Sequence, residues 1–171
     1  MAIQPPPTEE YPKYFDRYIK YVHEDDLLLA LKRVHDDSIK FIQSIPEEKF
    51  EYRYAEGKWT IRQIINHLTD VERVFAYRAL RFARMDTQPL PGFDENDYAI
   101  HANANARSTD DLMREYNAVR EATILLFKGF SEDMALRKGM ANNAEMSVRA
   151  LGYMIAGHEL HHMNVIRERY L

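Results

Sequence analysis

Four long amphipathic segments restrict the folds that this chain can adopt. Apolar side chains recur every three or four residues, the period of a helix with one buried face, over residues 26–44, 60–84, 108–129 and 147–170. We find no segment with a convincing strand pattern. Because four such helices must bury their apolar faces against one another, the sequence predicts an all-α four-helix bundle.

The expected helix starts coincide with residues that cap helices. Asp25 or Asp26 precedes the first segment, and Thr60 begins a capping box at the start of the second. Ser108 precedes the third segment and Ser147 the fourth. Each of these side chains can accept a hydrogen bond from the first turn of its helix, so the sequence predicts a helix start at each of the four positions.

The connections between the segments differ in length. Residues 85–107 form a long connection, which allows the third helix to run parallel to the second, whereas a short turn would force it antiparallel. Residues 131–146 contain Asn142-Asn143, a pair typical of tight turns. We expect one domain over residues 1–171, in which the proline-rich residues 1–12 form an extended arm.

Composition excludes several classes of partner. The net charge of −4 and the dispersed lysines and arginines do not predict nucleic-acid binding. No apolar run approaches the roughly 20 residues of a membrane span, and the N-terminal residues lack the pattern of a signal peptide. We therefore expect a cytoplasmic protein with no membrane partner.

Residues 157–162 (GHELHH) carry three of the seven histidines. His158 and His162 stand four residues apart, so on a helix they project from one face and can bind one metal ion. Burying both imidazoles without partners would cost roughly a few kcal/mol each, which a shared metal removes. The chain has no cysteine, so a third ligand must be histidine, aspartate or glutamate. His67, on the inner face of the second segment, is the best-placed donor.

The letters His-Glu-x-x-His also occur in zinc proteases, where the glutamate is the general base and a further ligand usually follows downstream. Only nine residues follow His162, and Glu168 is the one carboxylate among them. Glu168 points about 240° round the helix from His162. The predicted fold also lacks a sheet edge to hold a peptide. We therefore do not predict a protease.

Residues 57–68 (GKWTIRQIINHL) and 157–162 together resemble the DinB/YfiT superfamily of metal-binding bundles. Residues 77–81, 89–94 and 106–108 resemble one branch of it. The resemblance implies an up-down-down-up topology, which agrees with the long connection between the second and third helices. It also implies a divalent metal ion, commonly zinc or nickel, bound by three histidines. In this sequence those residues are His67, His158 and His162.

Three histidines leave a metal ion with an open position for water or substrate, which favours catalysis over a structural role. The resemblance implies a small-molecule enzyme, either a hydrolase or an S-transferase of a low-molecular-weight thiol such as bacillithiol or mycothiol. The alternative is a non-catalytic metal-binding or stress-response bundle. We expect a homodimer. An open metal position facing a polar cleft would favour the enzyme, whereas a plugged site would favour the alternative.

Four further residues are candidates for the site. Glu159 is either the catalytic base or a carboxylate at the rim. Arg78 shares a helix face with His67, so it either binds an anionic group of the substrate or forms a salt bridge. His35 departs from the resemblance, which implies a glutamine or another polar residue there. We keep His35 as a substrate-binding candidate beside the alternative of a hydrogen-bonded core histidine. His161 points off the ligand face and is expected at the edge of the site.

Overall fold

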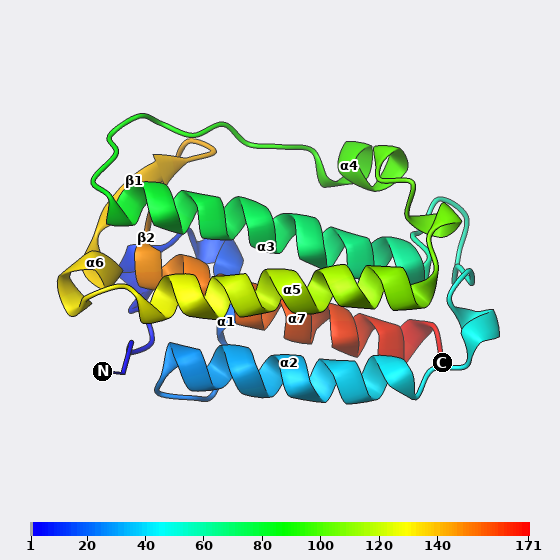
Figure 1. Ribbon diagram of the computed structural model, residues 1–171. Coiled ribbons are helices and arrows are strands. Elements are labelled where there is room, and N and C mark those ends of the chain that lie inside the picture. The colour runs from blue at the N-terminus through cyan, green and yellow to red at the C-terminus, as the bar shows by residue number, and fades with distance from the viewer. Residues whose placement is uncertain (1) are drawn as a thin grey trace.

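The computed structural model describes residues 2–171 and confirms the four-helix bundle. Its long helices are α2 (Leu27–Gln43), α3 (Ile61–Ala83), α5 (Thr109–Lys128) and α7 (Val148–Arg169). Figure 1 shows α2 and α7 running from left to right and α3 and α5 from right to left, which is the expected up-down-down-up topology. Across residues 2–171, every helix is too short or too polar to cross a membrane.

The helix starts are encoded locally, as the capping residues predict. Each cap side chain accepts a hydrogen bond from a backbone N–H in the first turn of its helix, and these residues are Asp26, Thr60, Ser108 and Ser147. At the start of α3 the capping box is complete, because Gln63 donates its N–H to the Thr60 hydroxyl and accepts from the Thr60 N–H. One such cap contributes about 1 kcal/mol.

The long connection between α3 and α5 follows α3 back to the end at which α3 began (Figure 1). It contains a short helix that the sequence did not predict, α4 (Glu95–His101), capped by the Asp94 carboxylate. Because the chain has returned by the start of α5, α5 can run parallel to α3. The short helix α6 (Glu132–Leu136) follows α5.

A small hairpin corrects the expectation that the chain has no strands. Strand β1 (Lys138–Ala141) pairs antiparallel with β2 (Ala144–Ser147), directly before α7. Asn142 and Asn143 join the strands with φ angles of 50° and 59°, as a tight hairpin turn requires. The turn was therefore predicted correctly, but strands of four residues are too short to show a clear alternation of polar and apolar side chains.

The hairpin also holds the loop that follows α3. The Leu90 N–H donates to the Met140 carbonyl at 2.9 Å, and the Asn142 N–H donates to the Leu90 carbonyl at 3.0 Å. Residues 90–93 are thereby fixed beside β1, although they are far from it in sequence.

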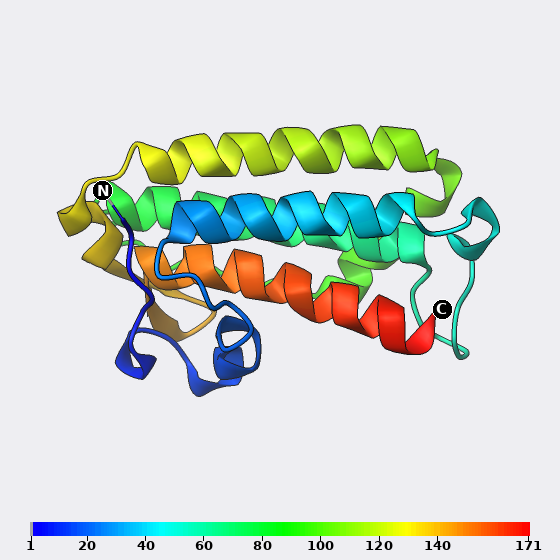
Figure 2. The same ribbon diagram turned by 90° about the horizontal axis from the view of Figure 1, so that it is seen from below.

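The N-terminal segment packs against α7, as Figure 2 shows below the bundle. Ile3 is buried, and its carbonyl accepts hydrogen bonds from the Leu27 N–H and the Tyr153 hydroxyl. The segment then forms the one-turn helix α1 (Asp16–Ile19). Helix α1 lies so close to α7 that a Cβ atom at Gly157 would stand 2.2 Å from the Tyr18 carbonyl oxygen.

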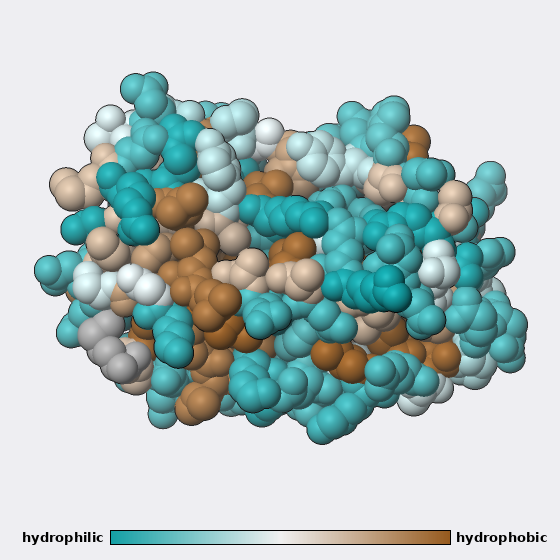
Figure 3. All heavy atoms as spheres, viewed as in Figure 1, coloured by the Kyte–Doolittle hydropathy of each residue, from teal (hydrophilic) through white to brown (hydrophobic). Residues whose placement is uncertain are grey.

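Hydrophobic side chains are concentrated inside the bundle. On the face shown in Figure 3 the surface is mainly hydrophilic; the larger group of hydrophobic residues lies towards the end at which α6 and the hairpin lie, and a smaller group lies at the lower right. Helix α7 is the most deeply covered element, since residues 150–159 are all buried. The functional part of this helix therefore lies in the core.

We predict that Gly157→Ala destabilises the protein by about 1–3 kcal/mol, because the added Cβ forces α1 away from α7. Urea unfolding measures the change. Gly129→Ala is the matched control, since a Cβ there meets only backbone atoms at 3.4 Å or more. Equal stability of Gly157→Ala and the parent protein would show that α1 has no fixed position on α7.

Candidate metal centre

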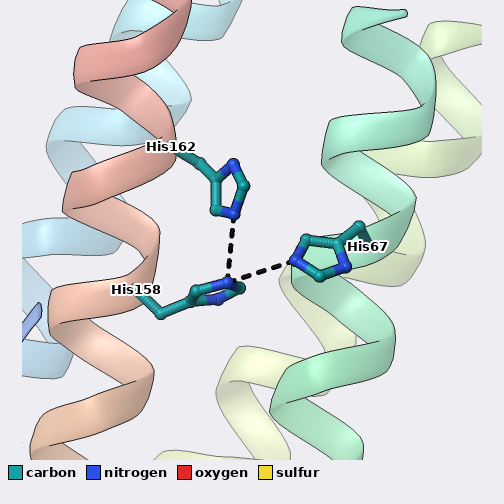
Figure 4. Close-up of side chains that lie close together, drawn as sticks. All are labelled: His67, His158 and His162. Carbon is teal, nitrogen blue, oxygen red and sulfur yellow. Dashed lines mark hydrogen bonds between the residues drawn. The ribbon is translucent and has the colours of Figure 1, made fainter. Parts of the chain in front are cut away.

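The structure brings together the three histidines that the sequence singled out. His67 comes from α3, and His158 and His162 come from successive turns of α7. The Nε2 atom of His158 lies 3.1 Å from that of His67 and 3.0 Å from that of His162 (Figure 4). One ligand atom from each ring lies within 4.8 Å of the others.

The arrangement of these nitrogens fits a metal ion better than a hydrogen-bond network. A ring nitrogen offers either one N–H or one lone pair. The Nε2 atom of His158 therefore cannot form a proper hydrogen bond to both of its neighbours. One cation can accept a lone pair from all three rings. Two nitrogens bound to one ion at about 2.0–2.1 Å lie at most about 4.2 Å apart, and both separations from His158 are below that limit.

Burial favours the uncharged form of all three imidazoles. It lowers the pKa of His67 to about 4. It also lowers the pKa of His158 and His162 well below the usual value, and the neighbouring histidines lower both further. Neutral imidazole is the form that donates a lone pair to a metal ion. The cluster is therefore ready to bind a cation at neutral pH without first losing protons.

Aromatic rings enclose the histidine cluster. The ring of Trp59, the only tryptophan, lies 4.6 Å from the ring of His67, centroid to centroid. The Tyr18 ring contacts His158 edge-on at 5.2 Å. The Nδ1 atom of His162 is buried and has no hydrogen-bond partner among residues 2–171, so packing rather than a hydrogen bond orients this ring.

A buried network of charges lies directly beside the cluster. The Arg120 guanidinium donates two hydrogen bonds of 2.8 Å to the Glu72 carboxylate and one of 2.5 Å to Glu159. It also donates to the Leu31 carbonyl at 3.0 Å, and the Tyr116 hydroxyl donates to Glu159. These contacts join α5 to α2, α3 and α7, so one side chain connects all four long helices.

The network changes the interpretation of Glu159. Its two carboxylate oxygens accept hydrogen bonds from Tyr116 and Arg120, and the side chain is almost completely buried. Glu159 is therefore a buried member of the network and not a carboxylate at the rim, and the alternative role as a catalytic base stays a prediction. The sequence did carry a signal for this network, since Glu72 and Arg120 are charged residues on the inner faces of their helices.

The other histidines lie outside the cluster. His35 is buried against the Tyr116 ring at 4.6 Å, where burial and the Arg120 cation lower its pKa. It is not among the residues that line the cavities adjoining His158 and His162, so the position agrees with the alternative of a core histidine, and a role in substrate binding stays a prediction. His161 is half-buried at the edge of the site, as expected, and His101 is exposed.

A cavity of about 360 Å³ adjoins His158 and contains Arg78 in its wall. Arg78 is only 5% exposed, and its guanidinium donates one hydrogen bond, to the Pro91 carbonyl at 2.9 Å. The guanidinium carbon of Arg78 lies 5.7 Å from the centroid of the Phe75 ring and 5.9 Å from that of the Phe93 ring. Arg78 forms no ion pair with any carboxylate of residues 2–171.

Several residues that shape this cavity were not predicted. Tyr18 belongs to α1, Phe93 and Glu95 to the loop and short helix after α3, and Met146 to β2. They come from segments without a long periodic pattern, so the sequence carried no signal that they meet. The aromatic residues clustered around Tyr18 were the nearest indication of a buried surface there.

The fold and the cluster together define a class, helical bundles with a buried three-histidine group suited to a divalent metal ion. Residues 30–166 match the DinB superfamily, and the chain belongs to that superfamily. It is 27% identical over 128 residues to a protein of Oceanobacillus iheyensis named "Putative metal-dependent hydrolase OB0413". The match covers 74% of this chain and 73% of that relative.

Two solved structures from Bacillus subtilis share the fold. YfiT, described as "a probable metal-dependent hydrolase with an unusual four-helix bundle topology", has a TM-score of 0.72 at 16% identity and covers 96% of this chain and 91% of its own. The DinB-like protein YjoA has a TM-score of 0.59 at 17% identity over 83% of this chain and 90% of its own. At these identities the likeness concerns the fold.

We predict that Arg120→Leu lowers the free energy of unfolding by about 3–5 kcal/mol, because it leaves two buried carboxylates without their cation. Urea unfolding tests this, with the exposed Arg114→Leu on the same helix as control. If Arg120→Leu does not fold, adding Glu72→Met and Glu159→Met should restore folding by removing the unpaired charges. A stable single variant would contradict the prediction.

We also predict that the reconstituted protein binds about one divalent ion per chain and that His67→Ala, His158→Ala and His162→Ala each lose it. Elemental analysis measures the ion, and quenching of Trp59 fluorescence by Ni²⁺ provides a second readout, since Trp59 lies beside His67. His101→Ala is the control. No stoichiometric metal in the parent protein would refute a metal centre.

Proposed function

We propose that this protein is a divalent-metal-dependent enzyme that acts on a small molecule with an anionic group, most simply as a hydrolase. One observation carries the proposal: a single cavity contains His158 of the cluster and Arg78, a buried guanidinium with no carboxylate partner in residues 2–171. A buried charge is unfavourable unless it is paired, so a partner from a ligand is expected. The name of the Oceanobacillus iheyensis relative supports the hydrolase class.

Zinc or nickel is the ion that we propose, held by the Nε2 atoms of His67, His158 and His162. A divalent cation supplies a Lewis acid that polarises a substrate oxygen. No fourth histidine, aspartate or glutamate joins the cluster within residues 2–171, which supports a catalytic ion, since structural zinc sites usually have four protein ligands. The adjoining cavity likewise favours the enzyme over a non-catalytic metal-binding or stress-response bundle.

Arg78 is the residue that we propose to bind the anionic group of the substrate. Phe75 and Phe93 restrict the guanidinium, so little of its freedom remains to be lost on binding. Tyr18 covers His158 and limits the access of water.

Glu95 replaces Glu159 as the proposed proton carrier. It lies in the cavity wall, where desolvation of the carboxyl group raises its pKa although Arg17 acts in the opposite direction. A carboxyl group with a raised pKa is better matched to accepting a proton near neutral pH.

An S-transferase acting on a low-molecular-weight thiol is the second candidate. It requires space for two reactants, and a second cavity that adjoins His162 is the observation in its favour. A homodimer remains a prediction.

We predict that Arg78→Met lowers metal-dependent turnover at least tenfold on a panel of small carboxylate- or phosphate-bearing esters and amides, or of thiols with electrophiles. The unfolding free energy should not fall, because the variant removes an unpaired buried charge. Arg114→Ala, an exposed arginine on α5, is the control for turnover. The proposal fails if Arg78→Met retains full activity, or if the metal-loaded parent turns over neither panel.

A further inference from the structure

A second cavity, of about 380 Å³, also adjoins the histidine cluster. It adjoins His162, whereas the cavity that contains Arg78 adjoins His158, and the two have no lining residue in common. Its walls come from residues 54–59 before α3 and from the C-terminal half of α7. Its volume is within the usual range of small-molecule sites, roughly 300–1,000 Å³.

Three aromatic residues form the body of this second cavity. The Tyr170 hydroxyl donates to the Trp59 carbonyl at 2.7 Å, which fixes the end of α7 to the segment before α3. The Tyr54 ring contacts the Tyr170 ring edge-on at 5.1 Å. Trp59 also lies almost parallel to the His162 ring, with 20° between the planes. A ligand on these surfaces would therefore lie close to the histidine cluster.

The charged residues of the second cavity are all basic. Lys58 and Arg169 line it, and none of its lining residues among residues 2–171 carries a carboxylate. Both are exposed, and neither forms an ion pair with a carboxylate of residues 2–171. Arg169 lies over the Tyr54 ring at 5.3 Å, so its charge is positioned at the cavity wall. Aromatic surfaces beside two unpaired cations suit an anion with a flat, apolar body.

We infer that this cavity binds a second ligand, a carboxylate with a ring or hydrocarbon body, separately from the molecule held by Arg78. The inference rests on the proposed function for the role of this ligand, since two separate cavities would let two small molecules reach the same metal centre. Lys58 and Arg169 bind the carboxylate, and Tyr54, Trp59 and Tyr170 bind the apolar body.

Benzoate is a suitable probe, and Trp59 is a built-in reporter because it is the only tryptophan and lines the cavity. In metal-free protein, benzoate should change Trp59 emission saturably, and benzamide, which has the same shape without the charge, should bind at least tenfold more weakly. Lys58→Ala with Arg169→Ala should weaken benzoate binding at least tenfold, whereas Lys58→Arg with Arg169→Lys should retain it. Arg78→Met should leave it unchanged.

Arg114→Ala with Lys128→Ala is the control, since it removes two exposed cations elsewhere and changes the net charge equally. The inference is overturned if benzoate gives no saturable change, if the Lys58 and Arg169 alanine variant binds it as the parent does, or if only Arg78→Met abolishes binding. Because the titration needs no metal, benzoate binding by a protein that fails to take up metal would refute the proposed function and leave this inference standing.

Discussion

The Arg120 guanidinium is the interaction on which the bundle depends, because it bonds to a residue of each of the other three long helices. Burying one cation with two carboxylates is favourable only when every partner is in place. Glu72 lies on the helix of His67, and Glu159 is the neighbour of His158. The network therefore also fixes the separation of the two helices that carry the histidine cluster.

Two long helices carry the histidine cluster, and segments from distant parts of the chain enclose it. Helices α3 and α7 supply the three imidazoles, whereas α1, the loop after α3 and the hairpin supply much of the cavity wall. Such a division is common, since a stable scaffold positions the reactive groups and loops vary the pocket. In this protein Gly157 lets α1 form part of the cavity wall, because a residue without a side chain allows α1 to lie directly on α7.

Charge distinguishes the two cavities beside the cluster. Arg78 is buried in the first, whose lining also contains Glu95, whereas Lys58 and Arg169 are exposed at the second, where no lining residue among residues 2–171 is acidic. Both cavities adjoin the imidazoles of the histidine cluster, which are uncharged because burial lowers their pKa. A cation held there would attract an anionic ligand in an adjoining cavity, which is favourable in a poorly solvated site.

The sequence by itself determined the features that depend on local geometry. Cap residues fixed the helix starts, and the four-residue spacing of His158 and His162 fixed their common face. The length of the 85–107 connection, with the family resemblance, predicted the topology. Only the tertiary structure decided which side chains are paired: Glu159 is held by Arg120, whereas Arg78 meets no carboxylate in the part of the chain that the structure describes. Pairing depends on contacts between helices, and helical periodicity identifies a buried face without identifying what it meets.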